Sequence, residues 1–234
     1  SNSYTFAAPS KDQIREERNE ASQDVASKMS AAREEAEALR KEMEEMRRQL
    51  GEDDELDWKD ERAMEELMKR QESLKTALEE LQKANKEKDE RANEFSPEEE
   101  RIIEKQEQLQ ELMEQVMNDE LKAMYDEMQR LMEQMDPEMM EEMQKQLESM
   151  EVDQESLEKE LDRALEQFKQ LEYEVNMQEA IEDLKELAEK QEQLAEETSE
   201  QNTPNDSLAA QQDSLNQEFE ELQERLDELD KANE

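Results

Sequence analysis

Along most of the chain, apolar residues recur at alternating steps of four and three residues. This spacing places them in one stripe along a helix, and the stripe packs against neighbouring helices. The first stripe begins near Ile14 and is regular from Val25 to Leu50, with Met29, Ala32, Ala36, Leu39, Met43 and Met46 in between. This pattern predicts a helix over residues 11–50. It begins after Ser10 and ends at Gly51, a residue typical of helix C-caps, and residues 52–57 then form a short connector.

A second helix is predicted over residues 57–93, with Asp57 as its N-cap and Trp58 anchoring its first turn. Its stripe consists of Met64, Leu67, Gln71, Leu74, Leu78, Leu81 and Asn85. Gln71 and Asn85 are polar residues at stripe positions, where they can fix the register of packed helices at some cost in stability. The pattern fades after Asn85.

Residues 96–150 are predicted to form methionine-rich helices. Ser96-Pro97-Glu98 and Asp136-Pro137-Glu138 are helix start signals, and Asn118-Asp119 is a candidate interruption between them. Val152-Asp153 marks a further predicted break. Ten of the sixteen methionines lie between Met113 and Met150.

The longest helix is predicted over residues 153–198, followed by a polar linker over 199–206 that contains Pro204, and a last helix over 207–234. Phe168 and Phe219 fall on stripe positions, so core packing explains both. Trp58 and Phe95 stand next to predicted turns, where they could close the ends of a hairpin.

These stripes and short connections predict an all-α fold of elongated antiparallel helical hairpins that form a coiled-coil bundle. Residues 1–10 differ from the rest. Tyr4, Thr5 and Phe6 favour extended backbone, and Pro9 disfavours helix at Ala8. The end of a preceding β-domain and an irregular tail both fit this segment.

The amino-acid composition excludes several classes of catalytic and metal-binding site. The 234 residues carry 72 acidic and 30 basic side chains, a net charge of −42, with no His, no Cys and one Gly. The usual zinc sites, Cys–His and Ser–His–Asp nucleophile systems and phosphate-binding loops are therefore excluded. We expect no enzyme activity, no catalytic residue, no cofactor and no metal. The charge also argues against nucleic-acid binding.

No apolar run approaches the roughly 20 residues that span a bilayer, so we expect no membrane insertion by this segment itself. The sequence starts without Met and stops within a heptad pattern, which is typical of an internal segment of a larger protein.

Charge is unevenly distributed. Residues 1–94 carry a net charge of −9, with 18 basic and 27 acidic side chains, whereas residues 95–234 carry −33, with 12 and 45. A row of basic residues in the first predicted helix is therefore expected to lie against the acidic later helices and relieve repulsion. The row consists of Arg33, Arg40, Lys41, Arg47 and Arg48.

The methionines allow two interpretations. Met is flexible and polarisable and is frequent on surfaces that bind varied partners, but it also fills bundle cores in place of Leu. Periodicity puts Met117, Met124, Met128 and Met135 on the stripe, which favours core packing. Met132, Met139 and Met140 fit one stripe less well and are the candidate residues of a partner-binding groove.

Carboxylates at Glu-x-x-x-Glu spacing could in principle hold a divalent cation, but 55 Glu produce this spacing by chance. A solvated acidic face explains them better, and an acidic decoy of nucleic acid is a minor alternative.

Two long stretches of the sequence resemble a known protein family. Leu157-Glu-Lys-Glu-Leu-Asp-Arg-Ala-Leu-Glu-Gln-Phe-Lys-Gln-Leu-Glu-Tyr-Glu-Val175 and Ala180-Ile-Glu-Asp-Leu-Lys-Glu-Leu-Ala-Glu-Lys-Gln-Glu-Gln-Leu-Ala-Glu-Glu-Thr198 resemble the coiled-coil part of large Bacteroidota envelope proteins catalogued as domain of unknown function 4175. Leu56-Asp-Trp-Lys59 and Glu104-Lys-Gln-Glu-Gln-Leu-Gln-Glu-Leu112 are similar to the same family. The resemblance implies an upstream membrane anchor and a β-domain, whose end would be Tyr4-Thr5-Phe6. The family has no established activity.

The expected function is accordingly that of a non-enzymatic coiled-coil spacer, scaffold or protein-interaction segment of a larger membrane-anchored protein in a bacterial envelope, with the periplasmic side favoured. Its partners would be proteins, including self-association through helical stripes. The alternative is a holdase-like chaperone that grips unfolded clients with its methionine-rich region.

Overall fold

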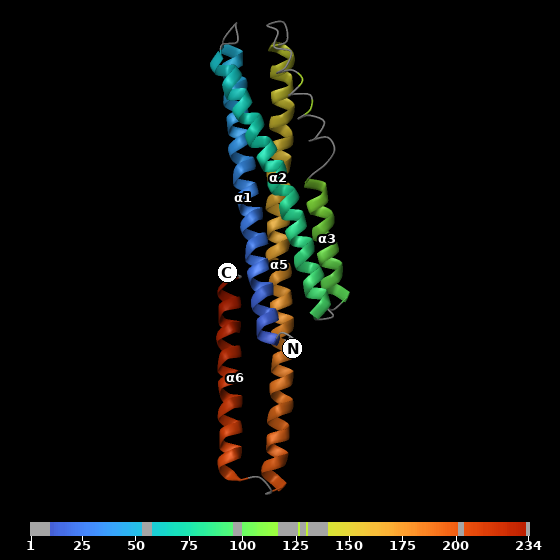
Figure 1. Cartoon of the computed structure of the whole chain (residues 1–234), viewed down its shortest axis with the longest axis vertical. Coiled ribbons are helices and arrows are strands. Elements are labelled where there is room, and N and C mark those ends of the chain that lie inside the picture. The colour runs from blue at the N-terminus through green and yellow to red at the C-terminus, as the bar shows by residue number, and fades with distance from the viewer. Residues whose placement is uncertain are drawn as a thin grey trace, which may run out of the picture. The chain divides into compact units, whose positions relative to one another are not determined.

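The computed structural model describes residues 10–52, 58–95, 100–116, 126, 130, 140–200 and 204–232. Within these ranges all regular secondary structure is helical, which confirms the predicted all-α class. The helices are α1 (Lys11–Glu52), α2 (Trp58–Phe95), α3 (Glu100–Val116), α5 (Met140–Glu200) and α6 (Asn205–Ala232) (Figure 1). The chain divides into unit 1, Ser1–Lys169, and unit 2, Gln170–Glu234, and α5 contributes to both. Tyr4, Thr5 and Phe6 lie outside the described residues.

Helix α1 begins with a reciprocal pair of hydrogen bonds. The backbone N–H of Gln13 donates to Ser10 Oγ at 3.2 Å, and the backbone N–H of Ser10 donates to Gln13 Oε1 at 2.9 Å. This capping box satisfies backbone donors for which the first helical turn offers no partners. The predicted start after Ser10 is confirmed. At the other end α1 continues through Gly51 to Glu52, slightly beyond the predicted end, a difference usual at fraying helix termini.

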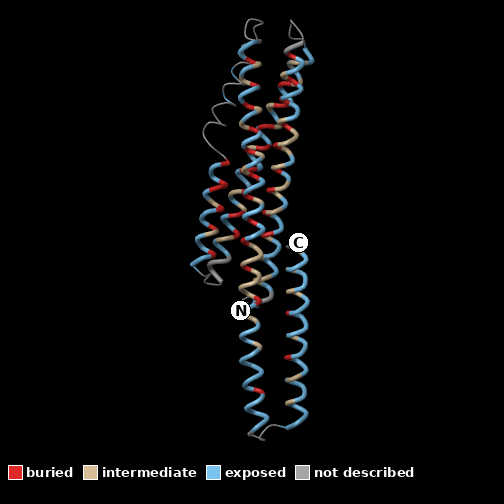
Figure 2. Tube along the Cα trace, turned by 180° about the vertical axis from the view of Figure 1, so that it is seen from behind, coloured by how far each residue is buried: buried red, intermediate tan, exposed pale blue. Residues whose placement is uncertain are grey.

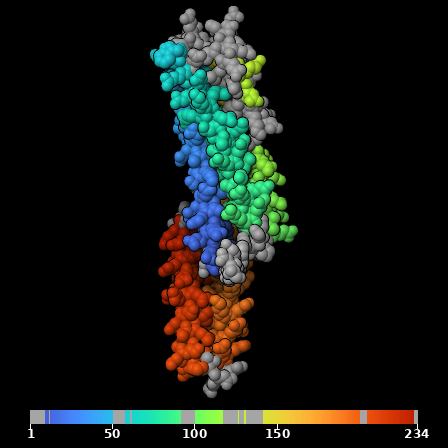
Figure 3. All heavy atoms as spheres, in the orientation of Figure 1, coloured from blue at the N-terminus to red at the C-terminus, as the bar shows by residue number. Residues whose placement is uncertain are grey.

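Unit 1 is built on antiparallel helices. Helix α2 runs back along α1, and α3 runs back along α2, where Gln82 Nε2 donates to the backbone carbonyl of Met113 at 2.6 Å (Figure 1, Figure 3). The first part of α5 is antiparallel to α1, since Arg40 of α1 bonds Glu158 and the later Arg47 bonds the earlier Glu151.

The predicted stripes form the core of unit 1. Side chains from α1, α2, α3 and α5 line one small cavity, so four helices meet at this level: Met29, Leu78, Leu81, Gln82, Met113, Val116, Leu161 and Ala164. Gln71 and Asn85, the two polar stripe residues, are buried as their positions predict. Burying these apolar side chains is the main contribution to the stability of unit 1.

The predicted break at Val152-Asp153 is wrong, because α5 runs unbroken from Met140 to Glu200. Met150 and Leu157 are buried. Gln154 occupies the stripe position between them and is also buried. Val and Asp in a helix interior cost less than about 0.7 kcal/mol each, which continuous packing of the stripe outweighs. Sequence reasoning missed the continuity because Gln154, a polar residue, fills the stripe position.

The linker predicted over residues 199–206 is shorter in the structure. Thr198 Oγ1 and Ser199 Oγ donate to the backbone carbonyls of Leu194 and Glu196, so these hydroxyls bond within α5 and the helix continues to Glu200. Helix α6 begins at Asn205, where the backbone N–H groups of Ser207 and Leu208 donate to the carbonyl of Pro204.

Unit 2 consists of the last part of α5 and all of α6, packed side by side as a hairpin (Figure 3). The buried apolar residues of this unit are Leu171, Val175, Ala180 and Leu194 of α5 and Leu215 and Leu222 of α6. Most other residues of α6 and of the last part of α5 are exposed, in contrast to the frequent buried residues of α1, α2 and α3 (Figure 2). A two-helix hairpin has only one contact line, so it covers few apolar side chains.

Candidate interaction surfaces

The predicted methionine groove lies almost wholly outside the described residues. Met132 and Met139 belong to ranges that the structure does not describe, and only the helical backbone of Met140, the first residue of α5, is described. The groove therefore stays a prediction. Of the other methionines between Met113 and Met150, those that the structure describes are buried: Met113, Met143 and Met150.

The basic row of α1 lies against α5, as predicted from the charge distribution. Arg40 Nε is 3.2 Å from Glu158 Oε2, Arg47 Nε is 3.1 Å from Glu151 Oε2, and Arg33 bonds Asp162. The hydrogen bond from Arg33 to Asp162 and the carboxylate's charge raise the pKa of the Arg33 guanidinium. These arginines are seven residues apart, so each turns the same way towards α5.

The other two basic residues of the row serve α1 itself. Lys41 pairs with Glu37 and Arg48 pairs with Glu45, each one turn away. The hydrogen bond from Lys41 lowers the pKa of Glu37, and the bond from Arg48 lowers that of Glu45. Exposed pairs of this kind contribute little to stability, because water screens the charges.

A buried amide pair joins α2 to α5 in unit 1. Gln71 Nε2 lies 3.3 Å from Gln154 Oε1 and 3.9 Å from Met43 Sδ of α1. Gln71 and Gln154 are both about 99% buried, and Gln154 Nε2 has no hydrogen-bond partner among the described residues. A buried amide pair favours one register of neighbouring helices, because sliding either helix leaves both groups without a partner.

A buried charge lies further along α2, 17 residues beyond Gln71. Lys88 is only 5% exposed, and its Nζ is 4.8 Å from the centre of the Phe168 ring of α5 and 3.3 Å from Asp89 Oδ1. Asn85 Nδ2 also donates to Asp89, at 3.2 Å. The cation is held by a carboxylate and an aromatic face, an arrangement that packs α2 against α5.

Sequence reasoning missed Lys88, because apolar residues no longer continue the stripe after Asn85. The signal was present, since Leu81, Asn85 and Lys88 continue the steps of four and three. Phe168, assigned to the core from its stripe position, is 2% exposed, which confirms that assignment.

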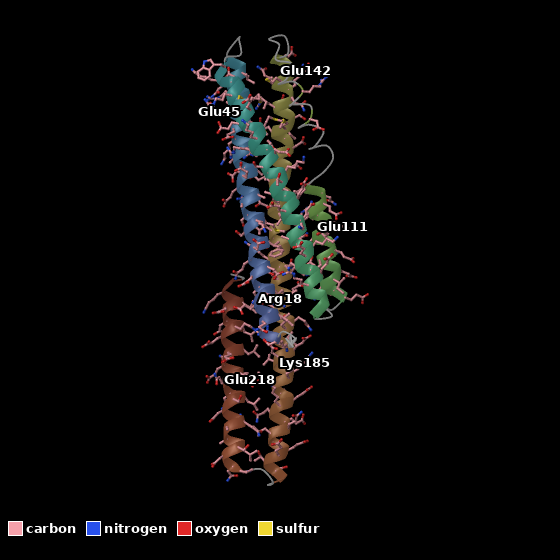
Figure 4. All side chains as sticks on the ribbon, in the orientation of Figure 1. Arg18, Glu45, Glu111, Glu142, Lys185 and Glu218 are labelled. Atoms are coloured by element: carbon pink, nitrogen blue, oxygen red, sulfur yellow. The ribbon has the colours of Figure 1, made fainter. Side chains whose placement is uncertain are left out.

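A groove of about 430 Å³ runs between α2 and α3 of unit 1. Its lining is mostly acidic and polar, with one lysine and one partly exposed isoleucine: Lys86, Asp89, Glu90, Ile103, Gln106, Glu107, Gln110, Glu111 and Glu114. Glu111 of α3 is labelled in Figure 4. In the described part of the chain, no group of three or more acidic side chains is placed as a metal site requires.

The hairpin of unit 2 has two different flanks. On one, Lys190 Nζ is 2.6 Å from Glu218 Oε2, and Arg225 Nη2 is 2.6 Å from Asp183 Oδ2. Asp183 and Lys190 are seven residues apart on α5, as are Glu218 and Arg225 on α6, so both pairs lie along the same side. We call this side, with its four residues, the ion-paired flank. Glu218 is labelled in Figure 4.

On the opposite flank, Gln191 and Gln212 exchange two hydrogen bonds of 3.0 Å between α5 and α6. Leu184 is seven residues before Gln191, and Phe219 is seven residues after Gln212, so both lie on the side of this amide pair. Ile181 precedes Leu184 by one short turn and shares its side. We call this set of five residues the apolar flank.

The three large side chains of the apolar flank are exposed, by 41% for Ile181, 38% for Leu184 and 51% for Phe219. Core packing, predicted for Phe219 from its stripe position, is wrong. Within the described part of unit 2, α5 alone faces α6 along this line and leaves the ring half uncovered. Trp58, predicted to anchor the start of α2, is 65% exposed, with Lys59 Nζ 5.9 Å from its ring centre.

Comparison of the chain with protein-family models, with curated proteins and with solved structures finds no match in any of the three. The resemblance to the envelope family therefore stays a prediction. None of the described helices combines the length and apolar character of a membrane-spanning segment.

Proposed function

We propose that this chain is a non-enzymatic helical scaffold that holds a protein partner, as part of a larger membrane-anchored envelope protein. The observation that carries the proposal is the contrast between the closed core of unit 1 and the exposed apolar flank of unit 2. Single exposed apolar residues are common, but a row of them on one side of a hairpin is typical of interaction sites. The envelope setting rests on the resemblance of residues 157–175 and 180–198.

Unit 1 supports the scaffold part of the proposal. Its buried polar side chains Gln71, Gln154 and Lys88 bond other helices or neighbouring side chains of the bundle. They fix the register of long helices, which is what a rigid support needs, whereas a catalytic site would direct such groups towards a substrate.

Photo-crosslinking in the cells that produce the protein tests the proposal. A photoreactive residue at Leu184 should give one or a few discrete adducts, because a scaffold has defined partners. The same residue at Val152, which is 61% exposed in unit 1, should give none and serves as the control. If no exposed position in either unit gives a discrete adduct, the scaffold proposal is contradicted.

A holdase is the second candidate, and the same exposed apolar flank supports it, since unfolded clients are bound through apolar contacts. The purified chain would then suppress aggregation of an unrelated protein during thermal unfolding, and crosslinking would give many heterogeneous adducts. A scaffold with a defined partner gives neither result.

A further inference from the structure

We propose that the apolar flank of unit 2 binds a basic amphipathic helix, one with an apolar stripe bordered by Lys or Arg. This inference rests on the proposed scaffold function and specifies the chemistry of its partner. It starts from a second stripe on α5 whose members are Met177, Ile181, Leu184, Ala188, Gln191 and Ala195.

This second stripe has the four-three spacing of a helix-packing line, but none of the helices that the structure describes covers it. Ile181, Leu184, Ala188 and Ala195 are exposed, whereas Leu187 and Leu194, on the line that faces α6, are less exposed. Phe219 extends the exposed area onto α6. A helix laid along this side would contact both α5 and α6 and complete a three-helix arrangement.

Charge decides between possible occupants. Unit 2 carries four basic and 21 acidic side chains, a net charge of −17. Two of those basic residues, Lys190 and Arg225, are paired on the ion-paired flank. By helical position, exposed acidic residues border the apolar flank on both helices: Glu192 and Glu196 of α5 and Asp227 and Asp230 of α6. One exposed lysine, Lys185, also lies on this border and is labelled in Figure 4.

A second copy of the chain would bring the same negative charge against this border, and like charges oppose association. A helix with Lys or Arg on both sides of its apolar stripe would instead meet carboxylates along its length. The apolar contacts would supply the binding affinity. The charges would raise the rate of association and select basic helices over acidic ones.

Fluorescence anisotropy of a labelled synthetic peptide tests the proposal with the full chain. The probe is a peptide of about four heptads with Leu on the stripe and Lys on its borders. Two comparison peptides carry Glu in place of the border Lys, or Gln in place of the stripe Leu. We expect the Leu/Lys peptide to bind the most tightly of the three.

The variant I181Q/L184Q/F219Q removes the apolar flank and keeps every charge. It should weaken binding of the Leu/Lys peptide by at least about tenfold, because the apolar contact area is lost. The matched control W58Q/I103Q/V152Q also replaces three exposed apolar residues by Gln, all in unit 1, and should leave affinity within about twofold. All replaced side chains are exposed, so helicity and melting temperature, measured in parallel, should change little.

Equal binding to both triple variants would overturn the proposal, since it would show attraction to the acidic surface in general. Concentration-dependent dimerisation of the wild type that the I181Q/L184Q/F219Q variant abolishes would also overturn it, in favour of a second copy. Salt separates the two, because it weakens binding of a basic helix and strengthens contact between like-charged copies.

Failure of this inference and failure of the scaffold are distinguishable. Discrete crosslinks from Leu184 without binding of the Leu/Lys peptide leave a scaffold whose partner is not a basic helix. Peptide binding without any discrete crosslink in cells leaves a basic-helix site but contradicts the scaffold.

Discussion

Helix α5 passes through both units and shows how differently the same residue pattern can be used. In unit 1 its stripe residues Leu157, Leu161 and Phe168 are no more than 2% exposed, because α1, α2 and α3 surround this part of the unit. In unit 2, Ile181 and Leu184 have the same helical spacing, yet each is about two-fifths exposed. The number of helices that meet at a given level therefore decides how much of a stripe is buried.

Polar side chains differ between the units in the same way. The amide pair Gln71–Gln154 is buried in the core of unit 1, whereas the pair Gln191–Gln212 is exposed on unit 2. Hydrogen bonds in a core are costly to break because the groups left behind cannot turn to water, whereas exposed groups can. Unit 1 should therefore tolerate few changes, and unit 2 many.

The largest expected effect comes from truncating a stripe residue in each unit. Leu161→Ala should lower the free energy of unfolding of unit 1 by about 2–5 kcal/mol, because it leaves a cavity among four helices. Leu184→Ala should cost about 1 kcal/mol or less, since this side chain is already exposed. Urea denaturation followed by circular dichroism measures both, with the exposed Val152→Ala as control. Similar costs at the two leucines would contradict the comparison.

Proline substitutions compare the two parts of α5 directly. Val152→Pro should destabilise unit 1 by about 3 kcal/mol, since it removes a helical hydrogen bond in a helix that the core needs to be continuous. Ala188→Pro, also at an exposed position, should reduce helicity in unit 2 and leave the unfolding midpoint of unit 1 in place. Thermal melts with Val152→Ala and Ala188→Gly as controls check this. If Val152→Pro leaves the stability of unit 1 unchanged, the helix break predicted at Val152-Asp153 from the sequence is supported after all.

The two amide pairs allow a smaller but sharper test. Gln71→Leu alone should cost about 1–3 kcal/mol, because Gln154 is left buried without that hydrogen bond, and the double variant Gln71→Leu/Gln154→Leu should recover most of the loss. The same cycle at Gln191 and Gln212 should show coupling below about 0.5 kcal/mol. Equal coupling energies from the two denaturation cycles would mean that burial does not distinguish the pairs.

The smallest expected effects concern two carboxyls of α5 within unit 1. Burial raises the pKa of Glu160, against a smaller opposing effect of Arg163, so its protonation favours the folded state. That contribution is complete below the ordinary pKa near 4.5 and is lost as pH rises through the folded value. Glu160→Gln should therefore stabilise unit 1 at pH 7, with the gain shrinking towards pH 4.

Glu155 provides the matched opposite case. The hydrogen bond and charge of Lys159 lower the pKa of Glu155, so its contribution is present above pH 4.5 and is lost as pH falls through the folded value. Glu155→Gln should slightly destabilise unit 1 at pH 7 and have no effect below that range. Melting temperatures from about pH 2 to pH 7 check both variants, because the lowered pKa of Glu155 lies below 4.5. The same pH trend for the two would show that overall charge, and not local surroundings, controls them.

The sequence by itself determined the all-α class and the start of α1. Steps of four and three fix a helix with one apolar stripe, and Ser10 with Gln13 defines where α1 begins, because capping depends on neighbours in the chain. The contact of Arg33, Arg40 and Arg47 with acidic residues of α5 also followed from charge distribution alone.

Only the tertiary structure decided which stripe residues are covered. Phe168 and Phe219 are alike in sequence position, yet one is buried and the other half exposed, because a local pattern does not specify how many helices share a stripe. Gln154 and Lys88 joined the core for a related reason. A polar residue interrupts the apolar pattern of a sequence, but its burial depends on partners from another helix. Gln71 is the partner of Gln154, and Phe168 is the partner of Lys88.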